Sequence, residues 1–248
     1  RHRKAMKPSE IDAHFRPERR PAGHDFAAEN GAHFTDAGQW KRAQWFARSG
    51  EADWLETVCR EVNTTRSAAG ICDVSTLGKI DIQGPDAGLL LDRLYINTFS
   101  TLPVGKARYG LMLREDGFAL DDGTVTRFAA DHYYLTTTTA NAARVMQHID
   151  FARQVLWPEL DVQAVSVTEH WATYAVAGPL SRALLSAALP DHDLSNAALP
   201  YMGACAVRWQ GIAARLFRLS FSGELAFELS VPAQHGEALV RALAEAGR

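Results

Sequence analysis

The segment 107–127 constrains the fold most, because two alternating stretches flank the dipeptide Asp116-Gly117. Both positions of such a dipeptide tolerate a positive φ angle, so it is typical of a tight β-hairpin turn. The second stretch ends in two adjacent carboxylates, Asp121 and Asp122. Successive strand residues face opposite sides of a sheet, so at most one of these carboxylates enters a given pocket. Proton chemistry and a plain strand end are both compatible with this acid pair.

Further strands and helices alternate along the chain on either side of this hairpin. Alternating or β-branched stretches predict strands over 78–83, 133–139, 161–168, 172–177, 204–209, 212–220 and 225–231. Apolar spacing of three to four residues predicts helices over 52–67, 86–95, 141–156, 180–189 and 232–246. Strands joined by hairpins and mixed with helices indicate an α+β fold with largely antiparallel sheets and packed helices.

A strand–helix unit occurs twice in the sequence. Gly84-Pro85 and Gly178-Pro179 each lie between a predicted strand and a predicted helix. Each of these helices carries a pair of leucines, Leu89-Leu90 in the first and Leu184-Leu185 in the second. The pattern indicates an internal duplication of one unit, with chance similarity as the alternative.

Residues 1–50 differ from the rest of the chain because they show little periodicity and many Pro and Gly residues. They also carry aromatic side chains that a free tail does not need, such as Phe15, Phe26 and Trp40. We therefore expect a linker or wrapping segment over 1–50 and one folded domain over 51–248. The first residue is Arg1, so we expect a fragment of a longer chain.

Composition and common motifs exclude several classes of function. The formal net charge of −3 gives no overall attraction to nucleic acid. No apolar run approaches the roughly 20 residues of a membrane-spanning helix, so we expect no membrane segment. The three cysteines form no C-x-x-C pair, which favours a reducing, cytoplasmic location. Phosphate-loop and metal-ligand spacings are absent from the sequence, so we expect no bound metal.

Several short motifs, in order, resemble one known family. They are Asp73–Ile80, Gly84-Pro85, Gly105–Tyr109, Asp116-Gly117, Asp121-Asp122, Thr136–Thr139, Val176–Pro179 and Phe221–Glu224 with Glu228. In this order and spacing they resemble the folate-binding aminomethyltransferase family, typified by the glycine-cleavage T-protein. Within it, the chain is most similar to the C-terminal part of the α subunits of heterotetrameric sarcosine oxidases. The resemblance runs from about residue 69 to the end.

The resemblance implies a tetrahydrofolate pocket with five named residues. It places Asp121 beside the folate nitrogens that take up the one-carbon unit, as a general base. It places Leu77 and Tyr109 along the pterin ring, Thr138 at the polar edge of the ring and Glu228 at its aminopyrimidine side. From the residues alone, Leu77 is equally compatible with a core position, Tyr109 with half-burial, Thr138 with ordinary strand sequence and Glu228 with an exposed face.

The resemblance also implies a reaction. The expected function is oxidative demethylation of sarcosine, with the one-carbon unit captured by tetrahydrofolate to give 5,10-methylenetetrahydrofolate. Flavin and NAD are expected elsewhere in the complex, and the other sarcosine oxidase subunits are the expected partners. The family domain continues further than residue 248 of this chain, so the fold is expected to be C-terminally incomplete. The alternatives are a glycine-cleavage-type aminomethyltransferase or folate-dependent demethylase, and a non-catalytic folate-binding or assembly protein.

Overall fold

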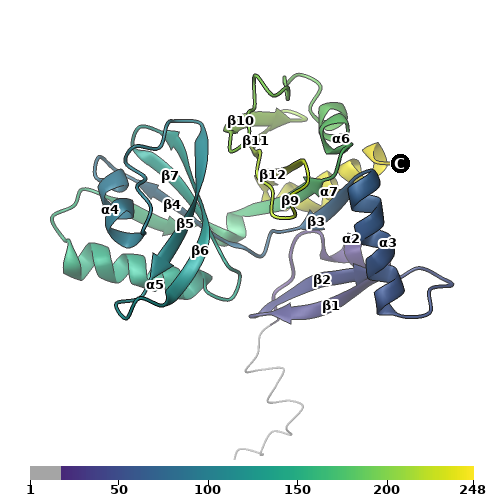
Figure 1. The fold of residues 1–248 in the computed structure, drawn as a ribbon, viewed down its shortest axis with the longest axis horizontal. Coiled ribbons are helices and arrows are strands. Elements are labelled where there is room, and N and C mark those ends of the chain that lie inside the picture. Colours follow the sequence, from purple (N-terminus) through teal and green to yellow (C-terminus); the bar gives the residue numbers. More distant parts are fainter. Residues whose placement is uncertain (1–17) are drawn as a thin grey trace, which may run out of the picture.

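The structure, a computed structural model, describes residues 18–248 (Figure 1). Two five-stranded antiparallel sheets dominate it, with strand orders β5-β6-β7-β4-β8 and β10-β11-β12-β9-β3. In Figure 1, helices α4 and α5 accompany the first sheet, and α6 and α7 accompany the second. The predicted α+β class with largely antiparallel sheets is therefore confirmed.

Both sheets are built by the same chain path, which confirms the predicted duplication. The first unit contains β3 (Gly70–Asp73), β4 (Gly78–Gln83), α4 (Ala87–Leu94), β5 (Lys106–Leu113), β6 (Ala119–Ala129), β7 (His132–Thr137) and α5 (Ala142–Phe151), the last followed by one π-helical turn, η1 (Ala152–Leu156). The second unit contains β8 (Gln163–Ser166), η2 (Thr168–His170), β9 (Trp171–Ala177), α6 (Ser181–Ala188), β10 (Ala204–Trp209), β11 (Ile212–Phe217), β12 (Ala226–Pro232), η3 (Ala233–His235) and α7 (Gly236–Ala246). The strand orders match position by position when β4 is equated with β9.

The two units exchange their first strands. β3 pairs with β9 of the second unit, and β8 pairs with β4 of the first. Residues 74–77 and 167–170 therefore cross from one sheet to the other, and we call these two segments the straps. Their hydrogen bonds are reciprocal, since Val74 N donates to Thr173 O (3.0 Å) and Val167 N donates to Lys79 O (2.8 Å).

Strap hydroxyls complete this pattern. Ser75 Oγ accepts from Thr173 N at 2.9 Å, and Thr168 Oγ1 accepts from Lys79 N at 3.0 Å. Each strap thus supplies a hydroxyl oxygen that accepts a hydrogen bond from a backbone N–H group of a sheet strand. Buried N–H groups require such a partner.

Gly84 and Gly178 end the equivalent strands β4 and β9 and both have positive φ, 139° and 115°. A Cβ atom at Gly84 would lie 2.3 Å from Asp161 O, and one at Gly178 would lie 2.2 Å from Thr65 O. Glycine is therefore required at both turns by backbone conformation and by close approach.

Three apolar clusters divide the core by layer. One lies between the first sheet and its helices and includes Ile80, Ile82 and Val145, and a second surrounds Val176, Leu229 and Leu239. The third lies between the sheets and contains Ala107, Tyr134, Ala204, Phe217 and Leu219. The rings of Tyr134 and Phe217 stack there at 5.6 Å between centroids. The inner faces of the two sheets therefore meet directly.

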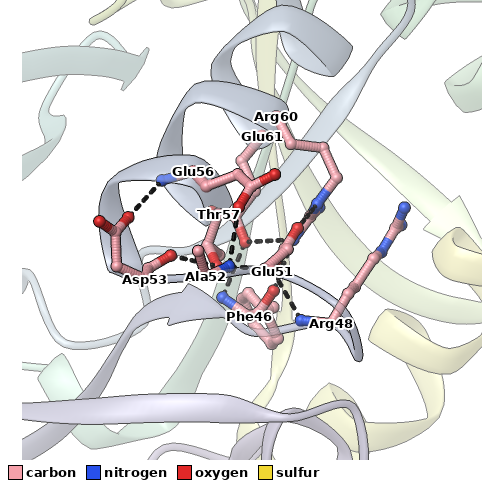
Figure 2. A network of polar contacts seen from close by, with 9 residues as sticks. All are labelled: Phe46, Arg48, Glu51, Ala52, Asp53, Glu56, Thr57, Arg60 and Glu61. Atoms are coloured by element: carbon pink, nitrogen blue, oxygen red, sulfur yellow. Dashed lines mark hydrogen bonds and ion pairs between the residues drawn. The ribbon is translucent and has the colours of Figure 1, made fainter.

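Residues 18–50 fold into elements of their own, which the sequence did not predict. They form α2 (His24–Glu29) and a hairpin of β1 (Ala32–Ala37) and β2 (Trp40–Phe46), followed by α3 (Trp54–Ser67). Figure 2 shows how Glu51 joins this segment to α3, since it accepts from Arg60 Nε at 2.5 Å, from Thr57 Oγ1 at 2.5 Å and from Arg48 N at 2.8 Å. The predicted domain boundary at residue 50 stays a prediction.

Candidate functional site

A narrow cavity with about 10 Å³ of free space lies between the inner faces of the two sheets. Its lining combines both sheets and the first strap: Val74, Leu77, Lys79, Thr124, Tyr134, Thr136, Thr173, Phe217, Leu219, Glu228 and Ser230. This free space holds about one water molecule, so a ring enters only when the lining side chains move apart. Most of its surface is apolar or hydroxylic, and it contains one acid and one base.

Glu228 supplies the acid from the middle of β12. Its neighbours Phe227 and Leu229 are fully buried in the cluster beneath the second sheet. Alternation turns Glu228 the other way, into the cavity, where the residue is partly exposed. Burial raises the pKa of Glu228 to about 7, and the nearby Lys79 charge opposes that rise. A carboxylate in this setting can accept two N–H groups from a flat ligand.

Lys79 supplies the base from β4 and is 1% exposed. Its Nζ donates to the carbonyls of Ser75 at 2.7 Å and Leu77 at 3.0 Å, both in the first strap. Burial lowers the pKa of Lys79 to about 8, and the charges of Asp73 and Glu228 oppose that fall. The sequence motifs did not single out Lys79. Alternation along the strand could have indicated it, because Lys79 precedes the core residue Ile80 and so faces the opposite side of the sheet.

Asp121 is buried, with 6% of its surface exposed, but it does not line the cavity. Its carboxylate accepts from Thr138 N (3.1 Å), Thr138 Oγ1 (2.6 Å) and Asn141 Nδ2 (3.1 Å). Across the ladder it pairs with Met112, which belongs to the core beneath the helices. Asp121 therefore lies on the helix-facing side of β6 and ties that strand to the start of α5.

Asp122 lies on the opposite face of the same strand. It shares that face with Thr124, which lines the cavity. The hydroxyl of Tyr109, on the neighbouring strand β5, donates to the Asp122 carboxylate. Because Tyr109 is 54% exposed, this pair lies at the open end of the inner face.

The five predicted site residues are thus divided among three places. Leu77 and Glu228 line the cavity together, and their contact with a pterin stays a prediction. Thr138 contacts Asp121 outside the cavity, and Tyr109 contacts Asp122. Lys79 and Asp122 are ionisable side chains on the inner face to which the sequence reasoning assigned no role.

A second, wider hollow of about 310 Å³ lies near the other strap. Its lining includes Arg19, Trp40, Ser75, Thr168 and Trp171. The Arg19 guanidinium stacks at 4.5 Å over the Trp40 ring and pairs with Glu169. No predicted site residue lines this hollow.

Two structural features are absent from the described part of the chain. Over residues 18–248, no group of three or more His, Cys, Asp or Glu side chains is arranged to hold a metal ion. In the same range, no helix has the length and apolar character needed to cross a membrane.

Residues 23–248 match the model of the GCVT N-terminal domain, so the chain belongs to that family. Among curated relatives, the sarcosine oxidase subunit alpha of Rhizobium meliloti (strain 1021) is 54% identical over 237 residues, which are 95% of this chain and 24% of the relative. The subunit alpha of Corynebacterium sp. (strain U-96) is 45% identical over 89% of this chain and 23% of its own length. The chain thus spans about a quarter of these relatives.

Aminomethyltransferases are more distant relatives of the chain. That of Anoxybacillus flavithermus (strain DSM 21510 / WK1) is 32% identical over 89% of this chain and 56% of its own length. Among solved structures, the glycine cleavage system aminomethyltransferase T of Bartonella henselae aligns with a TM-score of 0.77, at 23% identity, over 91% of this chain and 56% of that one. This likeness shows the shared fold.

Proposed function

We propose that this chain is the folate-binding part of an enzyme of the sarcosine oxidase type, in which it receives the one-carbon unit released from sarcosine. The proposal is supported by the 54% identity to a sarcosine oxidase subunit alpha, over nearly the whole chain. It places the chain in the cytoplasm with other sarcosine oxidase subunits as partners, and flavin and NAD sites elsewhere in the complex.

One observation carries the folate assignment: the Glu228 carboxylate faces a narrow apolar cavity between two sheets. Within residues 18–248 this carboxylate has no hydrogen bond and no ion pair, so it is available to a ligand. A pterin ring presents two parallel N–H donors on its aminopyrimidine edge, and a carboxylate accepts such a pair. Leu77 supplies apolar cover for a flat ring, and Thr136 and Ser230 add hydroxyls. Because the free space is only about 10 Å³, the lining side chains must move apart to admit the ring, and the remainder of a folate lies outside the cavity.

The open end of the inner face suits the chemistry of transfer. Tetrahydrofolate, when bound, supplies the nitrogen atoms that accept the one-carbon unit. Asp122, held by the Tyr109 hydroxyl, is the carboxylate on that side of β6. We therefore assign proton exchange to Asp122 and give Asp121 the task of fixing the end of β6 through Thr138 and Asn141. The sequence-based prediction of Asp121 as general base remains the competing assignment.

The test uses the full-length protein purified with its natural partner subunits. Sarcosine is supplied under air with and without tetrahydrofolate, and formaldehyde and 5,10-methylenetetrahydrofolate are measured. We expect formaldehyde alone when tetrahydrofolate is omitted, and mainly 5,10-methylenetetrahydrofolate when it is present. The variant Glu228→Gln should oxidise sarcosine normally but give formaldehyde even with tetrahydrofolate. Equal yields of the folate product from both proteins would remove the cavity from the reaction.

An aminomethyltransferase is the second candidate, favoured by the 32% identical relatives. Such an enzyme does not need flavin-bearing partners. If the isolated full-length protein transfers a one-carbon unit to tetrahydrofolate without any oxidation of sarcosine, this candidate replaces the first. Folate binding without turnover under either condition would indicate a non-catalytic binding protein.

A further inference from the structure

Lys79 is a buried base in the cavity to which the proposed function gives no task. Its ammonium group is held by the carbonyl oxygens of Ser75 and Leu77, at 2.7 and 3.0 Å. These two bonds fix the charge against the first strap, so it cannot swing out to solvent. A lysine that is 1% exposed and lacks a carboxylate within 4 Å among the described residues is costly to bury. Its retention there calls for an explanation.

Glu228 faces Lys79 across the same cavity. The two side chains come from different sheets, and the cavity lining includes both. Lys79 and Glu228 form no direct ion pair within the described residues. The electrostatic attraction between the two charges therefore acts across the space of the cavity. A bound ring would exclude water from this space, and the effective dielectric constant between the charges would then fall.

The other titratable groups around the pair are few. The Glu228 charge raises the pKa values of Tyr134 on β7 and Cys72 on β3, and the Asp73 charge raises that of Lys79. Two further cations act on these neighbours, Arg42 on Cys72 and Asp73, and Arg215 on Tyr134. Burial raises the pKa values of Tyr134, Cys72 and Asp73, so near neutral pH Tyr134 and Cys72 are uncharged. Lys79 is therefore the positive charge that acts on Glu228, whose own pKa burial raises to about 7.

We propose that Lys79 is a positioning residue whose charge favours the ionised form of Glu228, the form that accepts two N–H bonds from the aminopyrimidine edge of the ligand. A neutral Glu228 would present one acceptor and one misplaced O–H donor to that edge. This inference rests on the proposed function for the identity of the ligand. The ionisation of Glu228 itself is a property of the protein alone.

The test compares the full-length wild-type protein with Lys79→Met, which keeps a similar side-chain length without the charge. Binding of 5-formyltetrahydrofolate is measured between pH 6 and 9 by calorimetry. Loss of an opposite charge raises the pKa of a carboxyl group by about one unit or more. In Lys79→Met, we expect the pH below which folate affinity falls to be higher than in wild type by that amount. Binding should be at least about fivefold weaker at pH 7 and should recover at pH 9. Lys106→Met, on β5 of the same sheet, is the matched control and should leave the pH dependence of folate binding unchanged.

A second readout does not need the ligand. The protonated Glu228 carboxyl group is followed by infrared difference spectroscopy over the same pH range and assigned by its absence in Glu228→Gln. We expect its titration to shift upward in Lys79→Met. An unshifted titration overturns the inference, as does folate binding in Lys79→Met with an unchanged pH profile. Absence of folate binding to the wild-type protein at every pH overturns the proposed function, while the infrared titration still decides the link between Lys79 and Glu228.

Discussion

Asp121 and Asp122 are adjacent on β6, yet their carboxylates lie on opposite faces of the sheet. Asp121 is closed in by Thr138 and Asn141, whereas Asp122 meets the Tyr109 hydroxyl. The first arrangement fixes a strand end, and the second leaves a carboxylate beside the cavity face. One residue of register therefore separates a structural role from a chemical one.

The acid pair can be separated by matched substitutions. We expect Asp122→Asn to abolish one-carbon transfer to tetrahydrofolate while folate affinity changes by less than a few-fold. Asp121→Asn should retain transfer and lower the free energy of unfolding by about 1–3 kcal/mol, because it disturbs three hydrogen bonds to a buried charge. Product formation and urea unfolding of both variants give the comparison. Loss of transfer in Asp121→Asn with unchanged stability would return the role of general base to Asp121.

Glu228 predicts an unusual dependence of stability on pH. Its pKa is raised to about 7 in the folded protein, mainly by burial, so between pH 4.5 and 7 folding shifts this carboxyl group toward the protonated form relative to the unfolded chain. The contribution of Glu228 to the free energy of unfolding is fully present below pH 4.5 and is lost as the pH rises through 7. Glu228→Gln should therefore be more stable than wild type above pH 7, by about 1–3 kcal/mol. The two proteins should show no such pH-dependent difference below about pH 4.5.

Thermal melting at several pH values measures this effect. Glu245→Gln, an exposed acid in α7, is the control and should follow the wild-type curve. A Glu228→Gln curve parallel to wild type from pH 4 to 8 would show that Glu228 titrates as an ordinary carboxyl group.

The turn glycines after the equivalent strands should not tolerate a side chain. Gly84→Ala and Gly178→Ala each combine a positive φ with a Cβ that overlaps a carbonyl oxygen. We expect losses of about 2–4 kcal/mol in the free energy of unfolding. Gly117→Ala also has a positive φ but no atom within 4 Å of the added Cβ. It should cost only about 1 kcal/mol. Equal losses at all three positions would mean that close packing contributes nothing.

The contact of Glu51 with α3 predicts an acid-sensitive attachment of residues 18–50. Hydrogen bonds from Arg60 and Thr57 lower the pKa of Glu51 to about 2. The stability that Glu51 provides is therefore present above pH 4.5 and is lost as the pH falls toward 2. Glu51→Gln should increase hydrogen exchange at α3 amides at pH 7, and the difference from wild type should shrink as the pH falls below about 4.5.

The control for this measurement is Glu56→Gln, in the first turn of the same helix. Glu56 accepts a hydrogen bond from Ala52 N at 2.7 Å, and within residues 18–248 it has no arginine or lysine partner. The Glu56→Gln protein should therefore keep α3 attached to residues 18–50. A Glu51→Gln difference that stays constant with pH would exclude the Glu51 charge as its source.

Much of the fold is accessible from sequence because its units obey local rules. The strand Gly78–Gln83 has the bounds that its alternation predicts, since Ile80 and Ile82 alternate with polar residues. Asp116-Gly117 forms the predicted turn, with Gly117 at φ 84°. The hairpin of β1 and β2 escapes prediction because β2 is only partly buried along its length, so no clear alternation marks it.

The site is less accessible, because sequence alternation gives two faces but does not say which one is internal. For Asp121 and Asp122 the choice depends on pairing with Met112 and Leu111 across a ladder that contains a bulge. For Glu228, the face opposite Phe227 is polar in sequence and is equally compatible with solvent. Only the first sheet, packed over this face of β12, makes it a cavity.

The two straps limit how a ligand can reach this cavity. Each sheet contains a strand that belongs to the other unit. Moving the two units apart would therefore break the β3–β9 and β8–β4 strand pairings. A hinge between the sheets is therefore unavailable, and the width of the space is set during folding. A ligand must therefore enter past side chains and loops at the rim of the cavity. Neither repeat can form its complete sheet without a strand from the other.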